Sequence, residues 1–383
     1  MNVLIDIPLI SKSGGSTRHL QNFISALERS KTDINYFMTI DKSLASLVDF
    51  SHVKKTNIVY IDKSSKFKSI KYTFYGYRNI ITSYDIAIVV SLINIGFIFP
   101  PIPQVNFQRN ALTYSKNIPT DGGLKSKLRN HIERLLFIKI MKDSACVVIP
   151  TRAMQEMIMN FTNDRRINFC ILPHAINLQE LKVKHIPQDK SARFLERDNN
   201  KRLLYVSHFM PHKNHFILID ALSNLISRGC NVKLYLTIDK RDWPTGYTDL
   251  ISKLKSLNLV EHVVLLSRTS ASEVSYLYRN SDIFAFPSLC ESFGFPLMEA
   301  MACGSALVVA DTPVNREICS EAALYHDPYS SIDLADKVYE ILKDRNLFLD
   351  LKERSYERFH STNLSWDEYV TRFEKILKGI DRN

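Results

Sequence analysis

Short apolar segments that alternate with helical patterns constrain the fold of this 383-residue chain more than any other sequence feature. In the first half, strands are predicted at 2–7, 34–40, 57–61, 85–91, 104–107, 145–150 and 167–173. In the second half, they are predicted at 202–207, 232–238, 262–266, 282–287 and 306–310. Helical patterns lie between many of them, at 17–28, 124–142, 151–162, 214–228, 247–257 and 271–279, and from Pro296. Such alternation is typical of βαβ units, which build parallel sheets.

A polar, charged stretch from Pro187 to Asn200 divides the chain, and we interpret it as a linker. The alternating pattern restarts after it, so we predict an α/β fold with two doubly wound parallel-sheet domains. The boundaries that we expect are 1–185, 186–362 and a closing helical segment at 363–383. In such folds a ligand binds beyond the carboxyl ends of the strands, here in a cleft that the two domains face.

The composition is that of an ordinary globular protein, with 45% hydrophobic and 23% charged residues. None of the six cysteines forms a C-x-x-C pair, which predicts free thiols in a reducing compartment. The first residues, NVLIDI, predict a strand rather than a signal peptide. The apolar run at 86–105 is nearly long enough to span a bilayer, but prolines break its end. We interpret it as a buried strand that runs into a loop.

The positive charge is concentrated in the first half of the chain. Residues 1–185 carry 25 Lys+Arg against 13 Asp+Glu, whereas the remaining residues carry 25 against 27. This imbalance predicts an anionic partner. The plain interpretation of the basic and aromatic stretch at 63–78 is a solvated basic surface, and the more specific one is a segment in a lipid headgroup region. No nucleic-acid-binding signature accompanies the stretch. We therefore expect an anionic membrane surface, and no nucleic acid, as a partner of the basic half. We also expect the helix at 124–142 to have a basic outer face and to pack on the core through Leu128, Ile132, Leu135, Leu136 and Ile138.

Two loops that follow predicted strands are suited to an anion. In SKSGGSTRHL (11–20), Gly14 and Gly15 permit close backbone approach at a helix N-terminus, although a plain turn explains them equally well. The loop is neither a dinucleotide-binding G-x-G-x-x-G nor a P-loop. In VSHFMPHKNH (206–215), Lys213 lies at a helix entry with Asn214 as the predicted N-cap. Pro211 argues against one helix face carrying the three histidines, so we favour solvated or phosphate-facing histidines over metal ligands.

The stretch ESFGFPLMEA (291–300) places Glu291 before a predicted helix and Glu299 just inside it. Pro296 fits the first helical position. Eight residues of helix span about 12 Å, which is too far for both carboxylates to act on one bond. The pair instead suits a diphosphate at the helix start, flanked by a sugar and a ribose. The plain alternative is a surface Glu291 and a Glu299 that complements the helix dipole.

Taken together, these motifs resemble the retaining glycosyltransferases of family 4, which have the GT-B fold. The family's E-x7-E signature matches Glu291 and Glu299, with Phe-Pro-Ser before it and Glu-Ala-Met-Ala-Cys-Gly after it. VSHFMPHKN resembles the family's phosphate-binding loop, and Gly14-Gly15 followed by Arg18 resembles its N-terminal glycine loop. LSWDEYVTRFEKIL (364–377) resembles the closing helices, which in this fold cross back to the N-terminal domain.

The resemblance implies that the C-terminal domain binds a nucleoside-diphosphate sugar. Glu299 would bind the ribose, Glu291 the sugar hydroxyls and Lys213 the diphosphate, which makes Glu291 and Lys213 the expected catalytic residues. The implied donor-binding set is Gly15, Ser207, His208, Lys213, Arg268, Glu291, Phe293, Gly294, Phe295 and Glu299. Such enzymes generally need no metal, and the chain has no D-x-D motif. We therefore expect no cofactor and no metal, only a nucleotide-sugar co-substrate.

The chain also departs from the family pattern. His208 stands where an arginine is often found, and His174-Ala175 replaces the usual Asn-Gly of the hinge. The family's histidine after the fourth strand is absent from VNFQRNAL (105–112), so the expected acceptor-side residues are Arg18, Asn106, Gln108 and Arg109.

We expect a cytoplasmic enzyme, peripherally attached to the inner face of a membrane, that transfers a hexose-type sugar with retention. The expected acceptor is a lipid-linked surface polysaccharide, such as a capsule or lipopolysaccharide, or a glycolipid. One alternative is a synthase with a soluble sugar acceptor. Another is a non-catalytic subunit that binds a nucleotide sugar.

Overall fold

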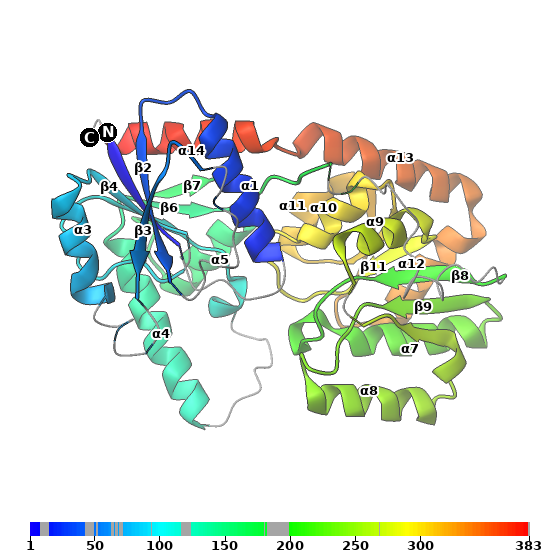
Figure 1. The fold of residues 1–383 in the computed structure, drawn as a ribbon. Helices are drawn as coiled ribbons and strands as arrows, with labels where there is room; N and C mark the ends of the chain where they lie inside the picture. Colours follow the sequence, from blue (N-terminus) through cyan, green and yellow to red (C-terminus); the bar gives the residue numbers. More distant parts are fainter. Residues whose placement is uncertain are drawn as a thin grey trace. The chain divides into compact units, whose positions relative to one another are not determined.

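The structure is a computed structural model that describes all residues except 8–14, 43–49, 51–52, 63–64, 66–67, 69–71, 93, 116–123, 180, 182–198, 268 and 382–383. For 15–18, 73–74, 124–131 and 271, only the backbone is described. The chain forms two compact units, whose elements are labelled in Figure 1. Unit 1 comprises Met1–Tyr114, Gly122–Ala175 and Leu364–Asn383, and unit 2 comprises Ser115–Asp121 and Ile176–Asn363.

Unit 1 is built on a seven-stranded parallel sheet with the order β3-β2-β1-β4-β5-β6-β7. Its strands are β1 (Asn2–Asp6), β2 (Asn35–Asp41), β3 (Asn57–Ile61), β4 (Ile88–Ser91), β5 (Gln104–Phe107), β6 (Cys146–Ile149) and β7 (Phe169–Ile171). The direction of winding reverses between β1 and β4. Because crossovers are right-handed, helices before and after this point cover opposite faces. One face carries α1 (Gly15–Arg29), and the other carries α3 (Tyr77–Ser83), α4 (Leu124–Lys142) and α5 (Arg152–Thr162).

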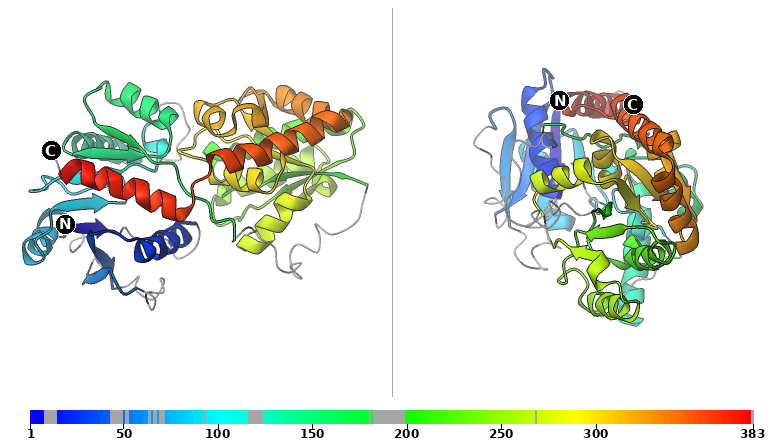
Figure 2. Two further views of the ribbon diagram at one scale, coloured as in Figure 1. Left: turned by 90° about the horizontal axis from the view of Figure 1, so that it is seen from above. Right: turned by 90° about the vertical axis from the view of Figure 1, so that its right-hand side faces the viewer.

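The last helix, α14 (Trp366–Asp381), returns to unit 1 and packs beside α1. The rings of Phe23 and Phe373 meet edge-on with centroids 5.5 Å apart. Figure 2 shows α14 lying along α1 and the N-terminal strand. The shared buried cluster includes Leu20, Phe23 and Leu27 of α1 together with Trp366, Tyr369, Val370, Phe373 and Leu377 of α14. The predicted return of the C-terminal helix is confirmed.

Unit 2 contains a six-stranded parallel sheet with the order β10-β9-β8-β11-β12-β13. Its strands are β8 (Lys201–Tyr205), β9 (Val232–Leu236), β10 (Val263–Leu265), β11 (Ile283–Phe286), β12 (Ala306–Ala310) and β13 (Ala323–His326). The reversal point lies between β8 and β11. One face carries α7 (His215–Ser227), α8 (Pro244–Ser256) and α12 (Ser331–Lys343). The other carries α9 (Ala271–Asn280), α10 (Phe295–Ala302), α11 (Pro313–Cys319) and α13 (Arg345–Thr362). The predicted α/β class with two doubly wound sheets is confirmed.

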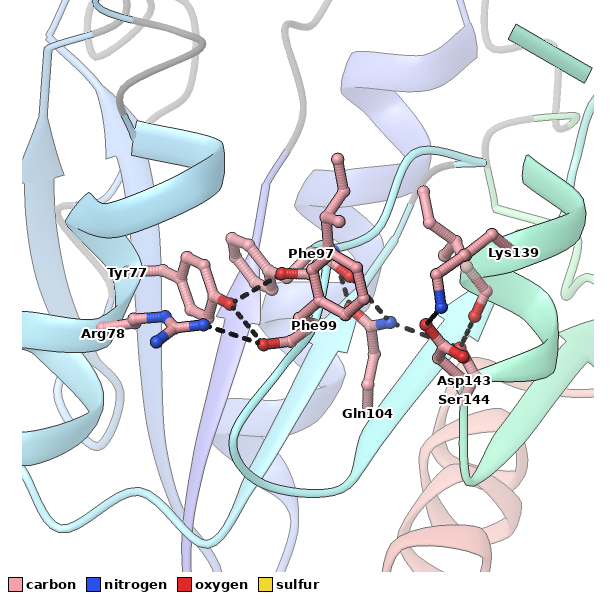
Figure 3. A network of polar contacts seen from close by, with 10 residues as sticks. Tyr77, Arg78, Phe97, Phe99, Gln104, Lys139, Asp143 and Ser144 are labelled. Atoms are coloured by element: carbon pink, nitrogen blue, oxygen red, sulfur yellow. Dashed lines mark hydrogen bonds and ion pairs between the residues drawn. The ribbon is translucent and has the colours of Figure 1, made fainter. Parts of the chain in front are cut away.

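The apolar run at 86–105 forms β4, a connection and β5, as the proline pattern predicts. Side chains hold the connection in place: the backbone N–H of Phe97 donates to Gln104 Oε1 at 2.7 Å. The hydroxyl of Tyr77 donates to the carbonyl oxygens of Ile98 and Phe99, both at 3.2 Å (Figure 3). Among the residues that the structure describes, no helix is long and apolar enough to cross a membrane.

Helix α4 forms where the sequence predicts it, but its predicted packing face is only partly correct. Ile138 packs against a buried cluster as predicted, and the side chain of Leu128 lies outside the described residues. Ile132 and Leu135, in contrast, are 58% and 56% exposed. The most deeply buried described residues of the helix are Phe137, Ile140 and Met141, which recur at the i, i+3, i+4 spacing of one helical face. An apolar pair therefore lies on the surface of a basic unit.

Candidate functional site

Two loops of unit 2 leave the carboxyl ends of β8 and β11, the neighbouring strands at which the winding reverses. Ile283 of β11 is in register with Leu203 of β8, so the strands lie side by side in parallel. The backbone N–H of Leu289 donates to the carbonyl of His212 at 2.9 Å and fastens one loop to the other. In doubly wound sheets such a switch point is where ligands bind.

The first loop and the second are joined by a charge pair. Lys213 Nζ lies 2.5 Å from Glu291 Oε1, and the two side chains are only 14% and 12% exposed. Lys213 ends the short helical turn Pro211–Lys213, and the hydroxyl of Tyr205 donates to its carbonyl at 2.9 Å. An ammonium has three donors, so Lys213 can hold Glu291 and still offer hydrogen bonds to an anion. Both predicted catalytic residues thus lie together.

Asn214 occupies the predicted N-cap position of α7 but does not cap the helix. Its backbone is left-handed, with φ of 55°, and its side-chain amide donates to the carbonyl of Pro328 at 3.0 Å. Asparagine tolerates this conformation better than most residues. The residue therefore turns the chain sharply after Lys213 rather than satisfying the first helical amides.

The second loop ends at Gly294, whose φ of +81° lies in the left-handed region that favours glycine. A Cβ atom there would meet Leu297 Cδ1 at 3.1 Å. Helix α10 begins at Phe295, so Pro296 is its second residue and not its first as predicted. The positive end of the α10 dipole lies beside the loop that carries Glu291. Phe293 is buried and its ring lies 5.5 Å from that of Phe295.

Glu299, inside α10, contacts a buried tyrosine that the sequence did not single out. The hydroxyl of Tyr278, on α9, donates to Glu299 Oε2 at 3.2 Å, and Tyr278 is fully buried. Burial raises the pKa of Tyr278 well above its usual value, and the charge of Glu299 raises it further. The phenol therefore remains a donor that orients the carboxylate. Nothing in the sequence near Tyr278 signals this role.

The histidines of the first loop differ in their environments. His215 is buried, and its Nε2 lies 3.0 Å from Ser207 Oγ. Burial, aided by the charge of Lys213, lowers the pKa of His215 to about 3 and that of His212 to about 4. His208 is exposed, with Nδ1 3.6 Å from Asp242 Oδ2. Within the described part of the chain, no group of three or more His, Cys, Asp or Glu is placed to hold a metal ion.

A pocket of about 290 Å³ opens on the same edge of the sheet, beyond β9 and β10. Neither Lys213 nor Glu291 lines it, but hydrogen bonds connect their loop to Thr237 and Asp242, which flank the lining segment Ile238–Arg241. The N–H of Ser207 donates to Thr237 Oγ1 at 3.2 Å, and the N–H of Phe209 donates to Asp242 Oδ2 at 3.3 Å. The lining residues are Ile238, Asp239, Lys240, Arg241, Tyr247, Leu265 and Ser267.

The predicted residues of unit 1 lie at the carboxyl end of β5 and at the start of α1. Asn106 and Gln108 are fully buried: Gln108 donates to Asn106 Oδ1 and accepts from the hydroxyl of Tyr114. Arg109 is half-buried, with its Cζ 5.1 Å from the centre of the Phe107 ring. Gly15 begins α1. The side chain of Arg18, together with Gly14 and Arg268, lies outside the described residues.

Two doubly wound parallel-sheet units, the second with a buried lysine–glutamate pair at its switch point, have the architecture of the GT-B class of glycosyltransferases. Among solved structures, a sucrose-phosphate synthase from Thermosynechococcus elongatus has a TM-score of 0.77 at 14% identity, covering 99% of this chain and 98% of that one. An Anabaena protein, Alr3699/HepE, solved in complex with UDP-glucose, has a TM-score of 0.72 at 17% identity, with complete coverage of both chains. These likenesses establish the fold.

The sequence comparisons establish the family. Residues 188–358 match the family described as glycosyl transferases group 1. An uncharacterized glycosyltransferase of Methanocaldococcus jannaschii is 24% identical over 99% of both chains. The N,N'-diacetylbacillosaminyl-diphospho-undecaprenol alpha-1,3-N-acetylgalactosaminyltransferase of Campylobacter jejuni is 30% identical over 68% of both. The chain belongs to the group 1 (family 4) glycosyltransferases, retaining enzymes that transfer a sugar from a nucleotide sugar.

Proposed function

We propose that this enzyme transfers a hexose-type sugar, without a metal ion, from a nucleoside diphosphate to a hydroxyl of a lipid-linked surface glycan or glycolipid. The observation that carries the donor half of this proposal is the Lys213–Glu291 pair at the start of α10. Lys213 and the positive end of the helix together supply the charge that a metal ion supplies in other transferases. Ser207 and His208 border the same site by their place after β8.

In the proposed reaction, the bond between the anomeric carbon and the diphosphate oxygen breaks while the acceptor oxygen attacks the same face. The negative charge that develops on the diphosphate is stabilised by Lys213 and the amides around Phe293 and Gly294. The acceptor proton passes to the leaving phosphate oxygen, so no protein base is required. Glu291 orients the sugar through its hydroxyls, and Glu299, held by Tyr278, binds the ribose.

We further propose that the pocket beyond β9 and β10 receives the nucleobase. Its volume of about 290 Å³ lies at the lower end for ligand pockets, which suits one ring rather than a whole nucleotide. Arg241 is bound to Asp239 by two hydrogen bonds, at 2.9 and 2.5 Å, and both line the pocket. The likeness to a structure solved with UDP-glucose supports a uracil base.

The donor site is tested by binding of UDP to purified variants. Lys213→Ala is expected to weaken UDP binding by roughly 10- to 100-fold, as the loss of a charge-assisted hydrogen bond predicts. Lys253→Ala is the matched control, because Lys253 of α8 also forms an ion pair with a carboxylate, that of Asp220 on α7. Unchanged affinity in Lys213→Ala would refute the phosphate role.

The catalytic claim is tested with Glu291→Ala, which is expected to abolish transfer and donor hydrolysis while the fold survives. Slow hydrolysis of a nucleotide sugar by the wild type also separates an enzyme from a non-catalytic binding subunit. Full activity of Glu291→Ala would contradict the assignment.

For the acceptor half, we propose attachment to the inner face of an anionic membrane through unit 1. Lys139 Nζ lies 4.6 Å from the centre of the Phe99 ring, and Phe99 is 60% exposed. Ile132, Leu135 and Lys139 recur at helical spacing on one face of α4. Apolar tips beside cations suit a lipid headgroup region. The C. jejuni relative, named for a lipid-diphosphate acceptor, supports the same class.

Liposome flotation at low salt tests this attachment. Ile132→Ser/Leu135→Ser is expected to reduce binding to anionic vesicles, whereas Leu349→Ser, which alters a leucine of unit 2 that is 49% exposed, is not. If the wild-type protein does not bind anionic vesicles, the result would favour the alternative, a synthase with a soluble sugar acceptor.

A further inference from the structure

Side chains from four separate parts of unit 1 meet beside Arg109. They come from α1, from the end of β5, from the segment after β7 and from the first turn of α14. His19 Nε2 lies 3.2 Å from His174 Nδ1, and the His19 ring lies 4.7 Å from the Trp366 ring. The members of this Arg109 cluster are His19, Arg109, His174, Trp366 and Tyr369.

The cluster has more hydrogen-bond donors than acceptors. Arg109 Nε, Trp366 Nε1 and the hydroxyl of Tyr369 are buried, and none of the three has a hydrogen-bond partner among the described residues. Burial, and then the charge of Arg109, holds the pKa of both His19 and His174 well below the usual value. The histidines therefore stay neutral next to the guanidinium. A buried donor normally finds a partner, so the surplus predicts a missing acceptor.

No described carboxylate supplies that acceptor. The sequence contains no Asp or Glu at 7–27, 86–120 or 165–179, the segments that surround the carboxyl ends of β1, β4, β5 and β7. Asp6 is turned to the opposite face of the sheet, where the hydroxyl of Tyr72 donates to it at 3.1 Å. Asp367 of α14 pairs with Arg29 at 2.6 Å. None of these segments therefore provides Arg109 with a carboxylate, and an anionic ligand would supply the missing negative charge.

We propose that the Arg109 cluster binds a phosphate group of the sugar acceptor, an inference that rests on the proposed glycosyl transfer. A guanidinium presents a rigid fork of donors that matches two phosphate oxygens, and the half-buried Arg109 leaves part of this fork accessible. The indole N–H and the two imidazoles add donors around the same group. The cluster lies at the carboxyl edge of a doubly wound sheet, where such folds place their ligands.

Inorganic phosphate is the first probe, titrated into full-length protein that is saturated with UDP so that the Lys213 site is occupied. The readout is the NMR signals of histidine-labelled protein, assigned with His19→Asn and His174→Asn. Phosphate is expected to shift both imidazole signals and to move their titration to higher pH. Arg109→Gln is expected to weaken this response at least about tenfold. Arg165→Gln, which removes an exposed cation elsewhere in unit 1, is expected to retain it.

Two further probes separate the sources of the phosphate. A prenyl diphosphate in detergent represents a lipid carrier, and glucose 6-phosphate represents a soluble acceptor. Competition with inorganic phosphate by either probe, dependent on Arg109, supports the proposal and identifies the source. The proposal is overturned if none of the three shifts His19 or His174, or if Arg109→Gln responds like the wild type. UDP affinity and donor hydrolysis, measured on the same samples, report separately on the proposed function.

Discussion

The buried ion pair between Lys213 and Glu291 is expected to contribute both to the stability of the fold and to donor binding. Both side chains are largely buried, so removing one leaves the other without its partner. We expect Lys213→Met and Glu291→Gln each to lower the free energy of unfolding by about 1–3 kcal/mol. The double variant should lose less than the sum, with a coupling of about 0.5–3 kcal/mol. Denaturant unfolding of the four proteins measures this, and strictly additive losses would show that the pair contributes nothing as a pair.

The sequence could indicate both residues but not their contact. Lys213 and Glu291 were predicted to bind different parts of the donor, and only the pairing of β8 with β11 brings them together. Tyr278 could not be predicted at all, because a tyrosine in an amphipathic helix is indistinguishable from a core residue. Arg109 was predicted on the acceptor side without its histidine neighbours, since α1, β5 and β7 meet only in the folded sheet.

The start of helix α10 depends on the backbone conformation of Gly294. Gly294→Ala places a Cβ at φ of +81° and 3.1 Å from Leu297, so we expect a loss of about 1–2 kcal/mol of stability. The substitution would also reorient the backbone amides around Phe293 and Gly294, so UDP affinity should fall. Gly304→Ala, beyond the other end of α10, is the control: its φ is +65°, and the nearest atom lies 3.8 Å away. UDP affinity is measured by calorimetry. Equal effects of both variants would contradict the proposal that the start of α10 forms part of the donor site.

Most strands were predictable because continuous apolar runs mark buried parallel strands. The missed elements include the short helices α3 and α11 and the four-residue edge strand β13, which carries a histidine. The α4 error has a different origin. Apolar residues surround that helix on several sides, so periodicity does not decide which face is buried, whereas the sheet does.

Buried neutral histidines make the stability of the whole molecule depend on pH. His215 has a folded pKa of about 3, far below the unfolded value near 6.5, so only the unfolded chain takes up its proton between these values. Its contribution is full above pH 6.5 and falls by about 1.4 kcal/mol per pH unit below it. We expect denaturant-measured stability to decline from pH 6.5 towards 4.5, and less steeply in His215→Gln. A flat profile would contradict the burial of these imidazoles.

The return of α14 to unit 1 sets an order on biosynthesis. The core that contains residues of β1 and α1 is completed by Trp366, Tyr369, Phe373 and Leu377 of α14. The ribosome synthesises β1 and α1 first and α14 last. All of Ile176–Asn363 is synthesised in between. Unit 2 can therefore complete its sheet on the nascent chain. The apolar face of unit 1 that α14 covers stays exposed until α14 has been synthesised. A stop codon near residue 363 would remove few residues but would leave unit 1 permanently unfinished.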